Sequence, residues 1–212
     1  MRTILFDFDG TIADTLPIIF HSFRTTFLHF LQEHYENDDI IRLFGPPEIP
    51  ILQKQIPVHL HDDAIRYFYQ VYEQMHAAYP TDPRIADMLR SFHDAGIQMG
   101  IVTGKGRGSA DISIRLLGLE PFFPIVITGD EMQNYKPHPE GILRAMAYFQ
   151  ADPRKTMYVG DSDADIVAAR AANITSIGVN WLSVSQKTGG FTPQPDHTIT
   201  DPSSFTKWVL QM

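Results

Sequence analysis

Five short apolar runs alternate with segments of helical periodicity along this 212-residue chain. The runs cover residues 3–6, 97–102, 123–127, 157–159 and 174–179. Alternation of this kind is typical of strands joined by helical crossovers, the connection that a parallel sheet requires. The sequence therefore predicts an α/β fold with a Rossmann-like parallel sheet as its core.

Capping and turn residues mark where several helices begin and end. Asp82-Pro83 predicts the start of one helix and Gly96 its end. Pro139 predicts the start of another, and Asp201-Pro202 the start of a short helix near the C-terminus. Residues 181–196 are rich in glycine and proline, so they predict a long loop.

Residues 15–80 are the exception to the alternation. Two long stripes of apolar and aromatic side chains at helical spacing occur here, with no convincing strand between them. The stripes consist of Leu16, Ile19, Phe20, Phe23, Phe27, Phe30 and Leu31, and of Ile65, Phe68, Tyr72 and Met75. Such stripes are core far more often than ligand sites, so we expect the two helices to pack together. The sequence thus predicts a core of residues 1–14 plus 81–212 and a helical insertion of residues 15–80.

Charge and composition exclude several classes of binding partner. The net charge of −8 and the absence of a lysine and arginine cluster argue against nucleic acid, because a polyanion needs a basic face. The apolar runs are all shorter than the roughly 18 residues of a membrane span, and Asp7 comes too early for a secretory signal. We therefore expect no membrane partner and a cytoplasmic location. No cysteine is present, which excludes thiolate chemistry, and the sequence is compatible with a monomer or a homodimer.

The first apolar run ends in two carboxylates, Asp7 and Asp9, that are two residues apart. Residues i and i+2 of an extended chain point the same way, so these side chains can converge on one cation and one substrate. Carboxylates this close repel unless a divalent cation or a shared proton offsets their charge, which indicates oxygen-ligated Mg²⁺. Gly10 permits a sharp exit of the backbone, and Thr11 adds donors for an anion. The structural alternative is an acidic turn after an edge strand.

Three further motifs follow at the ends of later runs. Thr103 comes directly after the run at 97–102, and Lys136 precedes a predicted helix. Asp161 and Asp165 follow the run at 157–159. Because an open α/β sheet gathers ligand chemistry at the carboxyl ends of its strands, we expect these side chains to meet. Each also has a structural alternative: the acids can cap or stabilise the start of the next helix, as Ser162 can, and Lys136 can be solvated.

Together, in this order and spacing, the four motifs from Asp7 to Asp165 resemble the haloacid dehalogenase (HAD) superfamily of phosphotransferases. The insertion at 15–80 is similar to the mobile cap that many members carry after the first strand. The resemblance therefore implies a HAD-like core with a helical cap. The acid at Asp9 favours phosphoryl transfer over dehalogenation, and the chain is most similar to the phosphoglycolate phosphatase branch and its relatives that cleave pyrophosphate.

The resemblance implies a Mg²⁺-dependent phosphomonoester hydrolase that acts on a small phosphorylated metabolite, phosphoglycolate-like or pyrophosphate. Asp7 would be the nucleophile that forms a phospho-aspartyl intermediate. Asp9 would first protonate the leaving oxygen and then activate water. Thr103 would donate a hydrogen bond to the phosphoryl group, and Lys136 would neutralise charge on Asp7 and on the phosphoryl oxygens.

The resemblance also implies the cation ligands. Asp7, Asp161 and the backbone carbonyl of Asp9 would ligate Mg²⁺, and Asp165 would act directly or through water. The expected substrate contacts near the phosphoryl group are Gly10, Thr11, Gly104 and Lys105.

Gly104 departs from the family pattern, because many relatives carry a polar side chain after the threonine. Lys105 then either compensates for the missing hydrogen bond or points to solvent. The stretch 104–108 also invites a nucleotide-binding interpretation, but it lacks Ser or Thr at 106 for a P-loop and Gly or Ala at 109 for a dinucleotide fingerprint. A helix N-terminus here is still available for the far end of a phosphorylated substrate.

Two alternative functions stay open. A sugar phosphomutase of the same superfamily shares all four motifs, and a non-catalytic phosphoryl-binding regulator is an alternative that the paired acids argue against. Substrate choice is expected to lie in the insertion, where the loop Gly45-Pro46-Pro47-Glu48 has the stiffness of a docking element. His21, Arg24 and Lys54 are the candidate contacts there.

Overall fold

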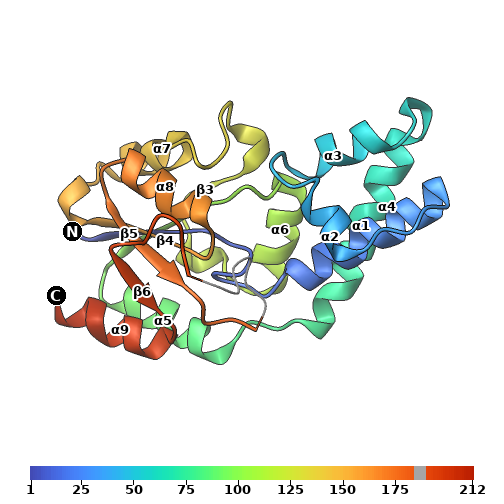
Figure 1. Ribbon diagram of the computed structural model, residues 1–212. Coiled ribbons are helices and arrows are strands. Elements are labelled where there is room, and N and C mark those ends of the chain that lie inside the picture. Colours follow the sequence, from blue (N-terminus) through green and yellow to red (C-terminus); the bar gives the residue numbers. More distant parts are fainter. Residues whose placement is uncertain (184–189) are drawn as a thin grey trace.

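The computed structural model describes residues 1–183 and 190–212, and these residues form one sheet of parallel strands (Figure 1). The strands are β1 (Thr3–Phe6), β2 (Gln98–Val102), β3 (Val126–Ile127), β4 (Thr156–Gly160), β5 (Thr175–Val179) and β6 (His197–Ile199). Their order across the sheet is β3-β2-β1-β4-β5-β6, and all neighbours pair in parallel. The predicted α/β fold with a Rossmann-like sheet is confirmed.

The strand order reverses beside β1, which lies between β2 and β4. The chain first builds outward from β1 through β2 to β3, and then crosses back to add β4 on the other side. In open α/β sheets such a reversal leaves a crevice outside the carboxyl ends of the strands. The segments that follow β1, β2 and β4 therefore meet at one place.

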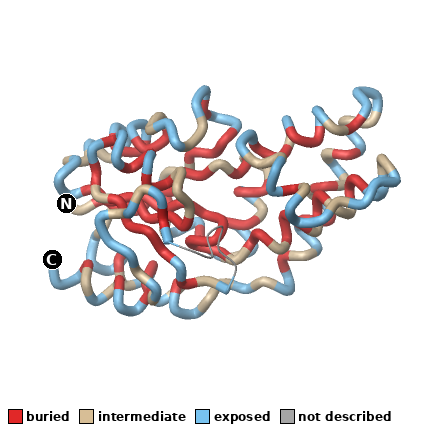
Figure 2. Tube along the Cα trace, viewed as in Figure 1, coloured by how far each residue is buried: buried red, intermediate tan, exposed pale blue. Residues whose placement is uncertain are grey.

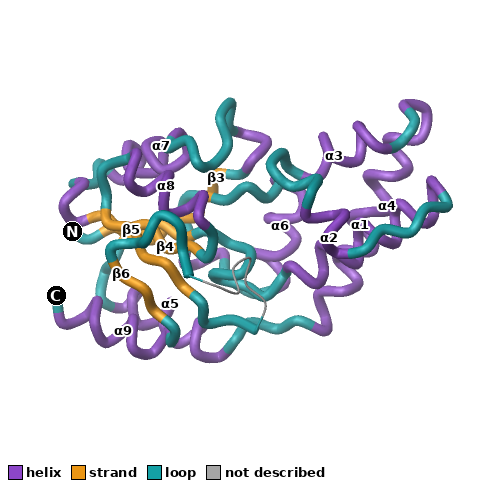
Figure 3. The backbone as a smooth tube through the Cα atoms, viewed as in Figure 1, coloured by secondary structure: helices purple, strands orange, loops and turns teal. Residues whose placement is uncertain are grey.

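Two layers of helices cover the sheet, and a third group of helices extends beyond it (Figures 1 and 3). Helices α5 and α9 cover one face, and α7 and α8 the other. The helices are α1 (Leu16–Leu31), α2 (Asn37–Ile41), α3 (Glu48–Gln55), α4 (His61–Met75), α5 (Pro83–Asp94), α6 (Arg107–Leu116), α7 (Glu140–Phe149), α8 (Asp163–Ala171) and α9 (Pro202–Gln211).

The alternation of side chains along β1 explains how one strand serves two layers. Ile4 and Phe6 belong to the cluster under α5 and α9, whereas Leu5 belongs to the cluster under α7 and α8. All three are fully buried, and the central strands run through the buried centre of the molecule (Figure 2). A strand with both faces covered is expected to be continuously apolar, as this run is.

Helices α1 to α4 lie between β1 and α5 in the chain and form their own hydrophobic cluster. The long helices α1 and α4 pack through Phe23 and Phe68, whose ring centroids are 4.8 Å apart. The expected packing of the two stripes is thus confirmed. The limits of the insertion, residues 15–80, stay a prediction. Within the described ranges, every helix is too short or too polar to cross a membrane.

The structure differs from the expectation at two strands. The run at 123–127 forms a strand only at its last two residues, because Pro124 has no N–H to donate to a ladder. The strand β6 was not expected, since its three residues are an edge strand that is exposed or half-buried. The predicted loop at 181–196 has neither helix nor strand at 181–183 and 190–196, and its residues 184–189 lie outside the described ones.

Two helices of the insertion were also missed. Helix α2 has only five residues, and α3 carries Pro50 in its first turn. Proline is tolerated there because the first N–H groups of a helix have no partner within it. The proline-rich start of α3 therefore resembles a loop in sequence.

Candidate active site

The chain turns sharply after β1 and aims two carboxylates at the crevice. The carbonyl of Phe8 accepts the N–H groups of Thr11, Ile12 and Ala13, which closes the turn. Gly10 adopts a φ of +81°, and a Cβ there would lie 2.3 Å from a carboxylate oxygen of Asp161. Only glycine lets the turn approach Asp161 this closely, so Gly10 is required for the local geometry.

Three carboxylates from two neighbouring strand ends meet beneath this turn. Asp7 follows β1, and Asp161 and Asp165 follow β4; an oxygen of each lies within 4.8 Å of the others. All three residues are buried. Ser162 is the N-cap of α8 and forms a capping box with Asp165, so the predicted capping role is present. Asp165 is also part of the acid cluster, so its role at the start of α8 and its place in the cluster are compatible.

Lys136 reaches this cluster from the loop before α7. Its ammonium lies 2.8 Å from a carboxylate oxygen of Asp7 and 2.6 Å from one of Asp165, and it donates to the hydroxyl of Tyr158 at 3.2 Å. Burial alone would lower the pKa of Lys136, but the carboxylates of Asp165 and Asp7 raise it well above the ordinary value. Lys136 is therefore a fixed positive charge beside Asp7, and the alternative of a solvated loop lysine is wrong.

For Asp7, in contrast, the surroundings disfavour the charged form of the side chain. Burial raises its pKa from 3.8 to about 6, although Lys136 opposes the shift, and the neighbouring Asp165 adds to it. Like charges in a dry site resist joint ionisation unless a cation joins them. The three acids and one lysine leave an excess of negative charge, which is the electrostatic character of a divalent-cation site.

This raised pKa has a consequence for the stability of the metal-free protein. The folded pKa of about 6 exceeds the ordinary 3.8, so ionised Asp7 destabilises the fold; the penalty is absent well below pH 4 and complete above about pH 6. Asp7→Asn in chelator should therefore raise the unfolding midpoint at pH 7.5 by several degrees, as 1 kcal/mol corresponds to about 2–4 °C here.

The advantage of Asp7→Asn should shrink as the pH is lowered to 5, where wild-type Asp7 is largely protonated in the folded state. Calorimetric or fluorescence melts at both pH values measure it. Asp94→Asn, on the exposed end of α5, is the control for loss of one charge. A midpoint that is unchanged, or lower, at pH 7.5 would contradict the assignment of Asp7 as a strained buried acid.

Asp9 points away from the acid cluster toward Lys105. Its carboxylate accepts a hydrogen bond from the Lys105 ammonium at 3.0 Å and another from the Thr15 hydroxyl. The side chain of Lys105 has no exposed surface, and its ammonium also lies 4.7 Å from the ring centre of Tyr72. The alternative in which Lys105 points to solvent is therefore wrong. Its expected contact with substrate stays a prediction.

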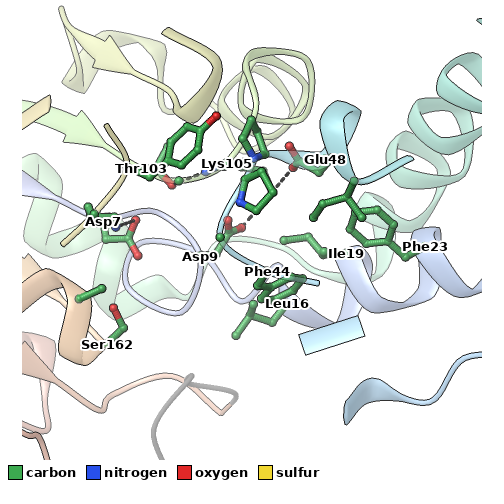
Figure 4. Close-up of a pocket in the computed structure, with 18 residues that line it drawn as sticks. Asp7, Asp9, Leu16, Ile19, Phe23, Phe44, Glu48, Thr103, Lys105 and Ser162 are labelled. Atoms are coloured by element: carbon green, nitrogen blue, oxygen red, sulfur yellow. Dashed lines mark hydrogen bonds and ion pairs between the residues drawn. The ribbon is translucent and has the colours of Figure 1, made fainter. Parts of the chain in front are cut away.

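A pocket of about 150 Å³ lies between the strand ends and the insertion (Figure 4). Figure 4 shows Asp7 and Ser162 on one side, Glu48 and Phe23 on the other, and Asp9 between them. Among the predicted site residues, those that line the pocket are Asp7, Asp9, Thr103, Gly104, Lys105 and Lys136.

The remaining predicted residues do not line this pocket. Asp161 and Asp165 lie behind Asp7 in the acid cluster. Gly10 shapes the turn, and the carbonyl of Thr11 accepts the indole N–H of Trp181 at 2.8 Å. Thr103 does line the pocket, and its hydroxyl accepts the N–H of Lys105 at 3.2 Å.

The expected specificity contacts are corrected by the structure. The side chain of Arg24 donates to Tyr35 and Asn37 within the insertion, Lys54 is exposed, and neither they nor His21 line the pocket. The loop Gly45-Pro46-Pro47-Glu48 does line it, as expected of a docking element. His21, Arg24 and Lys54 were expected as surface residues of the insertion, but a side chain faces the pocket only where its helix turns that face inward.

Several residues that line or support the site were not predicted from the sequence. Tyr158 supports Lys136, Thr15 supports Asp9, and the apolar lining Leu16, Ile19, Phe23, Phe44 and Ile51 comes from the insertion. Thr15 lies shortly after the turn that carries Asp9, so its hydroxyl could have been predicted as a donor to this acid. The apolar residues offered no such signal, because a stripe that packs on other helices looks the same as one that also faces a ligand.

Comparison with known proteins agrees with this geometry. The family model described as haloacid dehalogenase-like hydrolase matches residues 4–179. Pyrophosphatase PpaX of Bacillus pumilus is 34% identical over 197 residues, which cover 92% of this chain and 90% of that protein. PpaX of Oceanobacillus iheyensis is 34% identical over 203 residues, covering 95% and 93%.

Solved structures show the same fold. CbbY from Rhodobacter sphaeroides, solved with phosphate, superposes with a TM-score of 0.82 at 20% identity and covers 97% of this chain and 96% of its own. A hydrolase from Pseudomonas syringae gives a TM-score of 0.79 at 20% identity, covering 100% and 99%. The predicted class of enzyme, a phosphatase of this superfamily, is confirmed. The match over most of the chain shows that it belongs to the haloacid dehalogenase-like hydrolase family.

Proposed function

We propose that this protein is a Mg²⁺-dependent hydrolase of small phosphorylated metabolites that works through a phospho-aspartyl intermediate on Asp7. The observation that carries the proposal is the placement of the Asp7 carboxylate. It lies 2.8 Å from the Lys136 ammonium, next to the acids Asp161 and Asp165, and at the wall of a small pocket. A nucleophilic carboxylate needs this combination of accessibility and nearby positive charge.

Each residue has a role that its contacts support. Asp7 attacks phosphorus, and the Lys136 ammonium offsets the charge that accumulates on the phosphoryl oxygens. Asp9, which lines the pocket and faces Lys105, protonates the leaving oxygen and later takes a proton from the attacking water. The Thr103 hydroxyl donates a hydrogen bond to a phosphoryl oxygen. Lys105 and Thr15 hold the Asp9 carboxylate in place.

The donor set fits the expected cation. Asp7 and Asp161 would hold Mg²⁺ together with the carbonyl of Asp9, and Asp165 would act directly or through water. Carboxylates and carbonyls are the oxygen ligands that Mg²⁺ prefers, and three buried acids within 4.8 Å call for a compensating charge. When bound, the ion would supply charge stabilisation to the transferring phosphoryl group.

The helical insertion acts as a cap in this proposal, and residues 15–80 are its proposed limits. Its apolar side chains form the wall of the pocket opposite Asp7, where they would exclude water during phosphoryl transfer. The pocket of about 150 Å³ is below the roughly 300–1,000 Å³ of sites for drug-sized ligands. A small leaving group suits this space. Phosphoglycolate and pyrophosphate are the expected compounds of this size to test, and pyrophosphate is the substrate in the name of the PpaX relatives.

Release of inorganic phosphate from a panel of phosphate esters and pyrophosphate tests the proposal directly. We expect turnover with Mg²⁺ and its loss in excess chelator, with recovery when Mg²⁺ is restored. Turnover that persists in chelator would contradict metal dependence. Absence of phosphate release from every compound, with conversion of a sugar phosphate to its isomer, would instead support the phosphomutase. Mg²⁺ binding without any turnover would support the regulator.

A further inference from the structure

Glu48, the first residue of α3, is a buried carboxylate at the wall of the pocket opposite the acid cluster. Only 6% of its side chain is exposed, and it lines the pocket. One of its oxygens accepts the backbone N–H of Gly106 at 2.6 Å, and the other accepts the hydroxyl of Ser109. The insertion thus places a fixed negative group against the start of α6 (Figure 4).

The cations near the pocket are already paired. Among the described lining residues, the lysines are Lys105 and Lys136. Lys136 lies between Asp7 and Asp165, whereas Lys105 lies 3.0 Å from Asp9 and 3.9 Å from Glu48. The charge that a metal ion would bring lies with the acid cluster. The leaving group would lie against the opposite wall, which Glu48 and the insertion form. There the described lining offers no unpaired cation to an anionic group on the leaving group.

Apolar side chains of the insertion line the pocket beside Glu48. Leu16, Ile19, Phe23, Phe44 and Ile51 line it. An anion placed there would lose water without gaining a donor, and it would be repelled by the Glu48 carboxylate. The Gly106 N–H and the Ser109 hydroxyl, which lie next to this wall, donate to Glu48 itself. An uncharged alcohol encounters neither penalty.

We propose that Glu48 is a specificity-determining residue that disfavours substrates with a second negative charge on the leaving group, so that the pocket selects phosphate monoesters of small uncharged alcohols. The inference rests on the proposed phosphatase function and narrows its substrates. It separates this chain from an enzyme tuned to phosphoglycolate or pyrophosphate, whose leaving groups are anionic.

The test compares kcat/KM for two esters of similar size, 2-hydroxyethyl phosphate and phosphoglycolate. The first carries an uncharged hydroxymethyl group where the second carries a carboxylate. In the wild-type protein we expect the neutral ester to be preferred about tenfold or more, since like charges at contact range cost this much or more when partly desolvated. Preference for phosphoglycolate would overturn the inference. This measurement needs no variant.

Glu48→Gln supplies the second arm. The amide has nearly the same size but no charge, so the ratio of kcat/KM for phosphoglycolate to that for the neutral ester should rise about tenfold. Glu73→Gln is the matched control, because Glu73 pairs with Arg115 of α6 at 2.7 Å and also links the insertion to the core. Its ratio should stay at the wild-type value.

The wild-type comparison and the Glu48→Gln variant together distinguish an effect of charge from a loosened contact between the insertion and the core. A looser insertion would lower kcat/KM for both esters and leave their ratio unchanged, and that result in Glu48→Gln would overturn the inference. An equal rise in ratio in Glu73→Gln would overturn it as well. Failure of the wild-type protein to hydrolyse either ester or any compound of the panel would instead overturn the proposed function, and the inference with it.

Discussion

Asp7→Asn should lower phosphate release by more than about 10⁴-fold, the scale of loss when a nucleophile is removed from a cooperating catalytic group. The amide is a much weaker nucleophile than the carboxylate, and the phospho-aspartyl intermediate cannot form on it. Phosphate release in Mg²⁺ measures the loss. The change is isosteric and removes a strained charge, so the fold is expected to persist.

Asp94→Asn is the matched control, since it makes the same substitution on an exposed position of α5. It should keep wild-type activity. Trapping of a phosphoryl group on the wild-type protein, but not on Asp7→Asn, would locate the intermediate. Near-normal turnover by Asp7→Asn would remove the nucleophile assignment, whatever the behaviour of the other variants.

Asp9→Asn should lower kcat by about 100- to 10,000-fold, the contribution of a positioned general acid and base. The loss should depend on the substrate. An ester with an acidic leaving group, such as 4-nitrophenyl phosphate, needs little proton donation in the first step, so its loss should be smaller when that step limits the rate. Steady-state kinetics with both kinds of ester measure the difference.

Asp14→Asn is a control from the same loop, because Asp14 does not line the pocket and its carboxylate accepts the hydroxyl of Ser183. It should retain the activity that Asp9→Asn loses. An equal loss for good and poor leaving groups, with the intermediate accumulating in neither case, would show that Asp9 acts through positioning and not through proton transfer.

The acid pair and the apolar runs were sufficient to predict the fold and the position of the acids at the carboxyl ends of the strands. Local physics explains this success. A short apolar run between helical segments favours a strand that is buried on both faces, and Asp7 and Asp9 then lie at its carboxyl end. Gly10 signals a turn by its missing side chain. These features depend on neighbours in sequence.

The elements that were missed depend on distant neighbours. Edge strand β6 has no apolar run, and its pairing with β5 places it in the sheet. Helix α3 begins in a proline-rich segment, and its first residue is joined to the start of α6, 58 positions away. No local pattern encodes these contacts, because they arise only when the crossovers bring the segments together.

Lys105 and Lys136 show most clearly what the sequence determines and what the tertiary structure decides. The sequence alone determined that Lys105 follows a predicted strand and that Lys136 precedes a predicted helix, and it left open whether either ammonium faces solvent. Only the tertiary structure decided their partners: Lys136 joins Asp7 and Asp165, whereas Lys105 joins Asp9 and Glu48. Motif and spacing define which charges a chain carries to the crevice. Strand order, burial and the packing of the insertion decide which charges meet, because the energy of an ion pair depends on distance and solvent exposure and not on position in the sequence.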